Sequence, residues 1–167
     1  ALIVVACGLA RMAAAEDKWM TLPVPVPMPA ASESGYATVN GIQMYYAIYG
    51  AGDPVILLHG GLGNADYWSN QVPELAKSHK VIVADSRGHG RSTRNADPYS
   101  YALMASDVIA LMDHLKIDKA ALIGWSDGGI IGLDIAMRHP TRISKLFAFA
   151  ANSDPSGVKD VSQSPVF

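Results

Sequence analysis

Four continuous apolar runs of strand length recur along the chain and constrain its fold more than any other feature. Each run ends in glycine or polar residues, and they occupy residues 54–60, 80–90, 119–129 and 143–152. Strands that are apolar without alternation are typical of a parallel sheet covered on both faces, because neither side of such a strand meets water. We therefore expect these runs to form buried, parallel strands.

Helical patterns separate the later runs. A helix is predicted before the third run, with Asp107, Asp113 and Lys116 away from its apolar face. That face holds Leu103, Met104, Val108, Leu111, Met112 and Leu115. A second apolar helix is expected over 128–139, where Pro140 stops it. Residues 66–78 favour a weaker helix with a proline inside it.

The alternation of strands and helices predicts the fold class. It is typical of an α/β fold with right-handed crossovers, in which a mostly parallel sheet carries helices on both faces. Two short strands precede this pattern, joined at Asn40-Gly41, a pair that is a strong hairpin signal. A chain of 167 residues has room for about one such domain.

Composition gives no electrostatic reason to expect nucleic acid or an anionic membrane as a partner. Half of the residues are hydrophobic, the formal net charge is −2 and the pI is about 6.2. The basic cluster of Arg87, Arg91 and Arg94 is better interpreted as a solvated loop than as a phosphate site.

The first 15 residues resemble part of a secretory signal peptide. Residues 1–10 are apolar but too few to span a bilayer, and the alanines at 13–15 precede a charged segment. No initiating Met precedes them. We expect an exported protein, periplasmic or secreted. The alternative is a lipoprotein box, "VVAC", with Cys7 as the lipidated residue; Cys7 is the only cysteine, so the mature fold has no disulfide.

Residues 16–35 are interpreted as a proline-rich linker that leads to a domain over 36–167. Within the linker, "TLPVPVPMPA" places proline at alternate positions, which forbids helix and resists sheet. An extended spacer is favoured over a ligand for a proline-reading domain.

A serine stands where the third apolar run becomes a helix. Residues 124–128, "GWSDG", fit the pattern G-x-S-x-G with Ser126 at its centre. A strand that turns abruptly into a helix strains the central residue, and a side chain two positions away would clash, so glycine is needed there. The strained turn presents the serine hydroxyl at the start of a helix, where the N–H of Asp127 can donate to a developing oxyanion.

A second glycine-rich loop supports this interpretation. The segment "HGGLGN" ends the first apolar run, where a second oxyanion donor is needed; Gly61 is the first candidate and Leu62 the second. Neither loop has the spacing of a phosphate-binding or dinucleotide-binding motif.

These segments, in this order, resemble the α/β-hydrolase superfamily over roughly residues 36–152. The carrying motifs are "PVILLHGGLGNADYW", "VIVADSRGHGRST" and "LIGWSDGG". The form G-W-S-D-G-G is similar to that of the serine esterase branch that includes valacyclovir hydrolase. The resemblance implies hydrolysis of a carboxylic ester or related acyl bond through an acyl-enzyme on Ser126, and a mainly structural role for the turn over 85–92.

The resemblance also implies an acid and then a histidine after the nucleophile, and the chain offers poor candidates for both. Only His139 follows Ser126, and a helix of about 20 Å separates the two. Asp154 is a candidate acid after the sixth strand, although its Asp-Pro-Ser-Gly context also makes a good turn. We expect an N-terminal part of a longer hydrolase, truncated after about the sixth strand and without the general base.

Three further side chains have two interpretations each. The Asp127 carboxylate would attract a cationic substrate group, or serve only as an acid in the first turn of a helix. Tyr67 and Trp68 would line an acyl pocket, or pack in the core.

The sequence thus predicts a serine hydrolase for a small-molecule ester, with no metal or organic cofactor, no nucleic-acid partner and no stable membrane insertion. As 167 residues it is expected to turn over little substrate. A non-catalytic binding protein on the same scaffold is the alternative, and carbon–carbon hydrolysis or perhydrolysis is a third reading of the site. The oligomeric state is not indicated.

Overall fold

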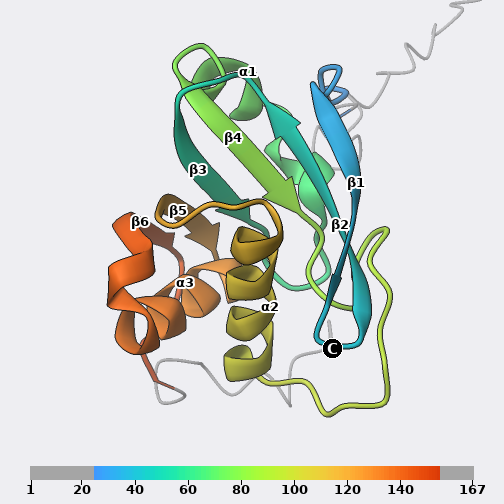
Figure 1. Cartoon of the computed structure of the whole chain (residues 1–167), viewed down its shortest axis with the longest axis vertical. Coiled ribbons are helices and arrows are strands. Elements are labelled where there is room, and N and C mark those ends of the chain that lie inside the picture. Colours follow the sequence, from blue (N-terminus) through green and yellow to red (C-terminus); the bar gives the residue numbers. More distant parts are fainter. Residues whose placement is uncertain (1–24, 155–167) are drawn as a thin grey trace, which may run out of the picture.

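A six-stranded sheet organises residues 25–154, the part of the chain that the computed structural model describes. Its strands are β1 (Glu33–Val39), β2 (Ile42–Tyr49), β3 (Asp53–Leu58), β4 (His79–Ala84), β5 (Ala120–Trp125) and β6 (Ile143–Phe149). The spatial order is β1-β2-β4-β3-β5-β6, antiparallel from β1 to β4 and parallel from β4 to β6 (Figure 1). The predicted fold class, α/β with a mostly parallel sheet, is confirmed.

The hairpin between β1 and β2 turns at the predicted dipeptide. Asn40 and Gly41 both have positive φ angles, 42° and 77°, as a two-residue turn that matches the twist of its strands requires. Val39 and Ile42 are paired directly across the turn.

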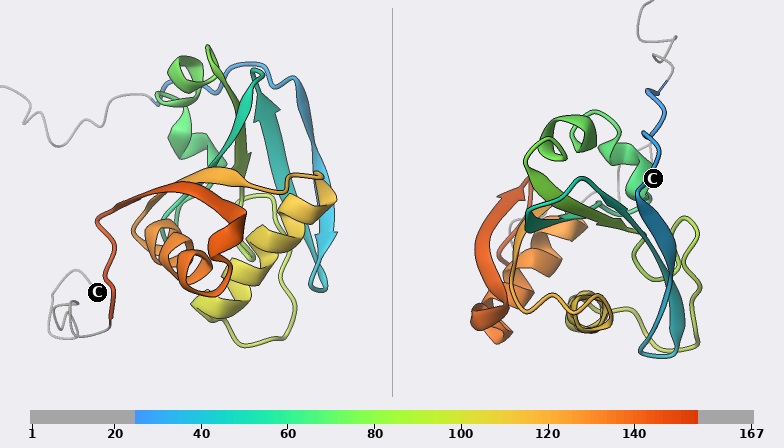
Figure 2. Two further views of the ribbon diagram at one scale, coloured as in Figure 1. Left: turned by 60° about the vertical axis from the view of Figure 1, so that its left-hand side comes forward. Right: turned by 45° about the horizontal axis from the view of Figure 1, so that its top comes forward.

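Helices cover both faces of the sheet (Figure 2). On one face lie α2 (Tyr101–His114) and α3 (Asp127–Arg138), and on the other lie the 3₁₀ helix η2 (Ala65–Trp68) and α1 (Val72–Leu75). Alternate residues of the buried strands serve the two layers. In β3, for example, Ile56 and Leu58 belong to the first core, which lies under α2 and α3, whereas Val55 and Leu57 belong to the second core, which lies under η2 and α1. This two-faced burial explains why the strands are apolar throughout.

The weaker helix expected over 66–78 is instead two short helices. Asn64 caps η2 by accepting a hydrogen bond from the Asp66 N–H, and η2 ends after one turn at Trp68. Pro73 then lies in the first turn of α1, where a missing N–H breaks no helical hydrogen bond. The proline therefore starts a new helix rather than interrupting one.

β6 departs from the expectation of a strand buried on both faces. It is the last strand of the described sheet, and only Ile143 and Leu146 pack against the first core. Phe147 and Phe149 are 61% and 62% exposed. The apolar run alone does not distinguish a central strand from one at the edge.

The interpretation of Arg87 as part of a solvated loop is wrong. Arg87 is buried and bound through two nitrogens to Asp107 of α2, with both contacts 2.7 Å long. Asp107, expected away from the apolar face of its helix, is buried with it. The two side chains can be buried because each charge is paired with the other. The hydrophobic periodicity of the helix does not reveal such a pair.

The end of the proline-rich segment lies against the domain. Residues 25–31 form no helix or strand. Met28 nevertheless packs on the second core, and Ser32 donates through its N–H and its hydroxyl to the Ile48 carbonyl. β1 begins at Glu33, slightly before the expected domain start at 36. The assignments of residues 1–24, including the signal peptide and Cys7, lie outside the described residues.

None of the helices within residues 25–154 has the length and apolar character of a membrane span.

Candidate active site

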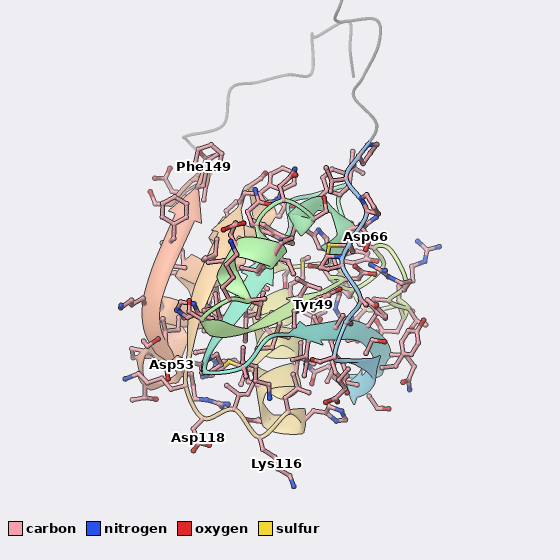
Figure 3. All side chains as sticks on the ribbon, turned by 90° about the horizontal axis from the view of Figure 1, so that it is seen from above. Tyr49, Asp53, Asp66, Lys116, Asp118 and Phe149 are labelled. Carbon is pink, nitrogen blue, oxygen red and sulfur yellow. The ribbon has the colours of Figure 1, made fainter. Side chains whose placement is uncertain are left out.

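The candidate site lies where the parallel strands end. In Figure 3 Phe149, at the carboxyl end of β6, is at one end of the molecule, and Asp53, at the start of β3, is toward the other. Ser126 follows β5 directly, and the glycine-rich loop follows β3. In open α/β sheets this carboxyl edge is the usual place for ligands.

Ser126 occupies the sharp turn that the sequence predicts. β5 ends at Trp125 and α3 begins at Asp127, so a single residue joins strand to helix. Its φ is 52° and its ψ is −122°, a combination that L side chains rarely adopt. The Ser126 N–H donates to the Phe149 carbonyl at 2.9 Å, and its carbonyl accepts the first helical bond from Ile130 at 3.0 Å. Both neighbouring elements therefore hold the turn.

The two glycines of the motif are required by close backbone contacts. A Cβ on Gly124 would collide with the Gly128 carbonyl, and one on Gly128 would collide with the Leu58 carbonyl. The strand, the turn and the loop after β3 are thus packed too closely for any side chain at these positions.

The loop after β3 lies against the turn. A Cβ on Gly60 would lie 3.0 Å from the Ser126 Cβ, and one on Gly61 would lie 2.6 Å from the Asp127 carboxylate. Leu62 has a φ of 60°, and its side chain is 92% exposed at the loop tip. The Gly61 backbone therefore lies against the turn, and the order of Gly61 and Leu62 as oxyanion donors stays a prediction.

Three backbone N–H groups at this edge have no acceptor. Those of Gly61, Leu62 and Asp127 make no hydrogen bond to any residue in 25–154. The Asp127 N–H also lies at the start of α3, where the helix dipole favours negative charge. Such groups can stabilise an oxyanion beside Ser126.

No histidine contacts the Ser126 hydroxyl. Within the described part of the chain that hydroxyl has no hydrogen-bond partner. His139 follows the last turn of α3, 12 helical residues and about 18 Å beyond Ser126. His79 begins β4, and His114 ends α2. The absence of the general base from these 167 residues stays a prediction.

His59 and His89 lie near the site but serve the loops. His59 is buried, and its two ring nitrogens contact the Gly60 carbonyl and the Ser86 N–H. Burial lowers the pKa of His59, and the neighbouring His89 ring lowers it further, against a smaller opposing effect of the hydrogen bond to Gly60. The His89 ring contacts the Arg87 carbonyl through Nδ1. Both rings therefore make hydrogen bonds to the backbone of the loops.

Asp154 follows β6, as predicted, but lines a different cavity from Asp127. That cavity, of about 330 Å³, lies over α3 and also contains Asn152 and Met137. The Ser153 hydroxyl donates to the Asp154 carboxylate at 3.5 Å. The role of Asp154 as the triad acid stays a prediction.

Tyr101 is a site residue that the sequence analysis missed. Its hydroxyl donates to the Asp127 carboxylate at 2.7 Å, and both side chains line a cavity of about 430 Å³ with His89 and Met104. Burial and the Asp127 carboxylate raise the pKa of Tyr101 to about 12. No sequence motif indicates Tyr101, which follows the Ser100 cap in the first turn of α2.

The two aromatic residues after the loop differ in burial. Trp68 is buried in the second core, so packing is its role. Tyr67 is exposed and lies 6.3 Å from the Trp125 ring, between centroids. Both border an apolar cavity of about 600 Å³ that Phe147 and Phe149 also line.

The turn after β4 is structural. Asp85 accepts hydrogen bonds from the Ala65 N–H and from the backbone and guanidinium of Arg91. Burial raises the pKa of Asp85, but these hydrogen bonds outweigh it and hold the pKa below its usual value. The turn thereby ties β4 to the loop after β3.

Within residues 25–154 no group of three or more His, Cys, Asp or Glu side chains is arranged to hold a metal ion.

A sheet of this order, with a strained serine between β5 and α3 and unpaired N–H groups beside it, defines the class of α/β folds that carry a nucleophile elbow. The family model of the alpha/beta hydrolase fold matches residues 53–166. The chain belongs to the α/β-hydrolase family.

Individual relatives support this assignment. The chain is 39% identical over 111 residues to a protein of Azorhizobium caulinodans named as the carbamate hydrolase RutD, covering 66% of this chain and 42% of that protein. It is 36% identical over 159 residues to the human serine hydrolase BPHL, covering 84% of this chain and 55% of BPHL. The enol-lactonase from Burkholderia xenovorans LB400 has a similar structure, with a TM-score of 0.65 and 36% identity, over 66% of this chain and 44% of the lactonase. The chain spans about half the length of the curated relatives it matches.

Proposed function

We propose that the protein is a serine hydrolase that cleaves a carboxylic ester, or a related acyl bond, of a small molecule through an acyl-enzyme on Ser126. The observation that carries the proposal is the strained turn at Ser126, beside which the N–H groups of Gly61 and Asp127 are unpaired. The relatives named as hydrolases act in its favour.

In the proposed reaction the Ser126 hydroxyl oxygen attacks the substrate carbonyl carbon while a base accepts its proton. The carbonyl oxygen becomes an oxyanion that receives hydrogen bonds from the Asp127 and Gly61 N–H groups. The C–O bond to the leaving alcohol breaks, the alcohol takes up the proton, and the acyl group stays on Ser126. Water then repeats the sequence and releases the carboxylic acid. One oxyanion donor is typically worth about 3 kcal/mol of transition-state stabilisation.

In this proposal the base lies outside these 167 residues. The acid that orients it also lies outside them or is Asp154, the one candidate acid within them. The five histidines of the chain are engaged elsewhere or distant. We therefore expect the 167-residue form to react slowly and the full-length gene product to react fast.

A fluorophosphonate probe, which bonds to activated serines, tests the proposal. We expect the full-length product to be labelled rapidly, the 167-residue form weakly, and the Ser126→Ala variant of either form not at all. Equal labelling of wild-type and Ser126→Ala full-length protein would exclude Ser126 as the nucleophile. A full-length protein that binds esters without labelling or turnover would favour the non-catalytic alternative.

A further inference from the structure

His59 is held in a single protonation state by its two partners. The Nδ1 atom lies 2.7 Å from the Gly60 carbonyl, which can only accept a hydrogen bond. The Nε2 atom lies 2.9 Å from the Ser86 backbone nitrogen, whose N–H can only donate. Both contacts are hydrogen bonds only when Nδ1 carries the proton and Nε2 does not. The buried ring is therefore the neutral Nδ1–H tautomer.

The Gly60 carbonyl has a second donor on the same turn. The Gly63 N–H donates to it at 3.1 Å. No peptide bond in residues 25–154 is cis, so the carbonyl of Gly60 and the N–H of Gly61 point in opposite directions from one planar unit. Whatever fixes the carbonyl also fixes the direction of the N–H.

The peptide unit that joins Gly60 to Gly61 needs a contact from another residue to fix its orientation. It lies between two glycines, neither of which has a Cβ to oppose rotation of the peptide plane. At the same time it lies against the reactive turn, because a Cβ on Gly60 would approach the Trp125 ring at 2.7 Å and the Ser126 Cβ at 3.0 Å. A flipped peptide would present the carbonyl oxygen where the N–H should be.

We infer that His59 is a positioning residue of the oxyanion hole: its Nδ1–H holds the Gly60 carbonyl and so aims the Gly61 N–H at the oxyanion, while the Ser86 N–H fixes the ring. The inference rests on the proposed function and adds to it a residue that does not touch substrate. It also explains why the loop after β3 begins with a buried histidine that is no base.

The ring's surroundings agree with this role. His89 lies 5.3 Å away between ring centroids, and the carboxylates of Asp85 and Asp127 act on His59 at longer range. Protonation at Nε2 would remove the acceptor of the Ser86 N–H and add a positive charge beside His89. The lowered pKa of His59 keeps that state rare near neutral pH.

Two substitutions separate the two hydrogen bonds. In His59→Asn the side-chain amide lies near the position of Nδ1 and can still donate to the Gly60 carbonyl. In His59→Gln the longer side chain reaches the position of Nε2 and can still accept from Ser86, but no donor faces Gly60. His79→Gln is a matched control, because His79 begins β4 and its side-chain hydrogen bonds within the described residues are to Ser78 and Leu75.

Steady-state kinetics of the full-length protein with an activated ester provide the first readout. We expect His59→Gln to lower kcat about 100-fold with KM nearly unchanged, as loss of an oxyanion donor does. His59→Asn, which keeps the donor to the Gly60 carbonyl, should retain kcat within about tenfold of the wild-type value. His79→Gln should match wild type. Equal kcat values for His59→Gln and wild type would overturn the inference about His59 but leave the proposed function standing.

NMR of the same proteins provides a readout that does not need turnover. We expect the His59 ring ¹⁵N shifts to show the proton on Nδ1, and the Gly60 ¹³C′ and Gly61 amide signals to move in His59→Gln but not in His59→Asn. A proton on Nε2, or unmoved Gly60 and Gly61 signals in His59→Gln, would overturn the inference even in an active enzyme. A wild type without Ser126-dependent turnover would instead overturn the proposed function.

Discussion

Ser126 has a backbone conformation that its own side chain disfavours, so its surroundings must hold it there. The hydrogen bonds to Phe149 and Ile130, on opposite sides of the residue, do so. The strain is useful, because the turn that causes it also leaves the Asp127 N–H without an acceptor at the start of a helix. Close packing of the backbone around Ser126 therefore holds the geometry on which the proposed nucleophile depends.

Substitution of Gly124 tests that packing. We expect Gly124→Ala to lower the free energy of unfolding by about 3 kcal/mol, since its methyl group would meet the Gly128 carbonyl in a region that cannot expand. Urea denaturation measures this. Gly35→Ala is the control, because the nearest atom to its Cβ, the Tyr46 hydroxyl, is at an ordinary 3.5 Å. Similar losses for both variants would contradict the account of the turn.

Titration of His59 gives the fold a pH dependence. Its pKa is lower in the folded state than its ordinary value of about 6.5. Between those two pKa values the unfolded chain binds more protons, so the free energy of unfolding rises with pH there and falls as the pH drops below about 6.5. The pKa of Asp85 is also lowered in the folded state. Asp85 therefore reduces the free energy of unfolding only when the pH falls below its ordinary pKa of about 3.9.

Urea denaturation between about pH 5 and pH 7.5 checks the first of these windows. The wild-type slope near pH 6 should be clearly smaller in His59→Asn and retained in His79→Gln. If His59→Asn kept the full slope, another group would be responsible.

At the scale of elements, the pair of Arg87 and Asp107 joins the turn after β4 to the middle of α2. Both side chains are 1% exposed, and Asn40 of the first hairpin also donates to the Asp107 carboxylate, at 2.9 Å. Three segments far apart in the sequence thus meet at one carboxylate. An ion pair this deep stabilises little by itself, but loss of one partner leaves the other charged and buried.

We expect Asp107→Asn to cost about 3–5 kcal/mol in the free energy of unfolding for that reason. The double variant Arg87→Met/Asp107→Leu should recover part of the loss, because it buries no charge. Glu74→Gln, which breaks a pair with Lys77 in which both side chains are about 70% exposed, should cost less than about 1 kcal/mol. Urea denaturation of the three variants gives the comparison, and a small effect of Asp107→Asn would contradict the buried pair.

The elements were predictable to different degrees. The central strands, the hairpin at Asn40-Gly41 and the long helix α2 follow from local patterns, since apolar runs and helical spacing reflect which faces are buried. The split between η2 and α1 does not, because it depends on the cap at Asn64. Nor does the burial of Arg87, which is decided by a partner 20 residues further along the chain.

At the scale of the whole molecule, the site depends on topology. Sequence motifs indicate Ser126, Gly61 and Asp127 because the glycines of these motifs lie where a side chain would meet neighbouring atoms. No motif indicates Tyr101 or the buried contacts of His59. The sheet order brings Tyr101 of α2 to Asp127 and brings Ser86, in the turn after β4, to His59. The triad acid and base are expected from the family resemblance, and their positions stay predictions.

The exposed side of β6 has a consequence for the 167-residue form. Phe147 and Phe149 lie on the last strand of the described sheet, next to the apolar cavity bordered by Trp125. Exposed apolar edge strands associate with one another. We expect this form to self-associate in sedimentation velocity experiments and Phe147→Lys/Phe149→Lys to remain monomeric. Tyr36→Lys, an exposed aromatic on β1 at the opposite edge, should not change the association. A monomeric wild type would contradict this prediction.

Ser126 is tested as the nucleophile by locating the covalent adduct that a serine-reactive probe leaves on the protein. The full-length protein is treated with a fluorophosphonate, digested, and its peptides are sequenced by mass spectrometry. We expect one modified residue, Ser126, in the peptide that joins β5 to α3. Modification of any other serine, with Ser126 unmodified after complete reaction, would contradict it.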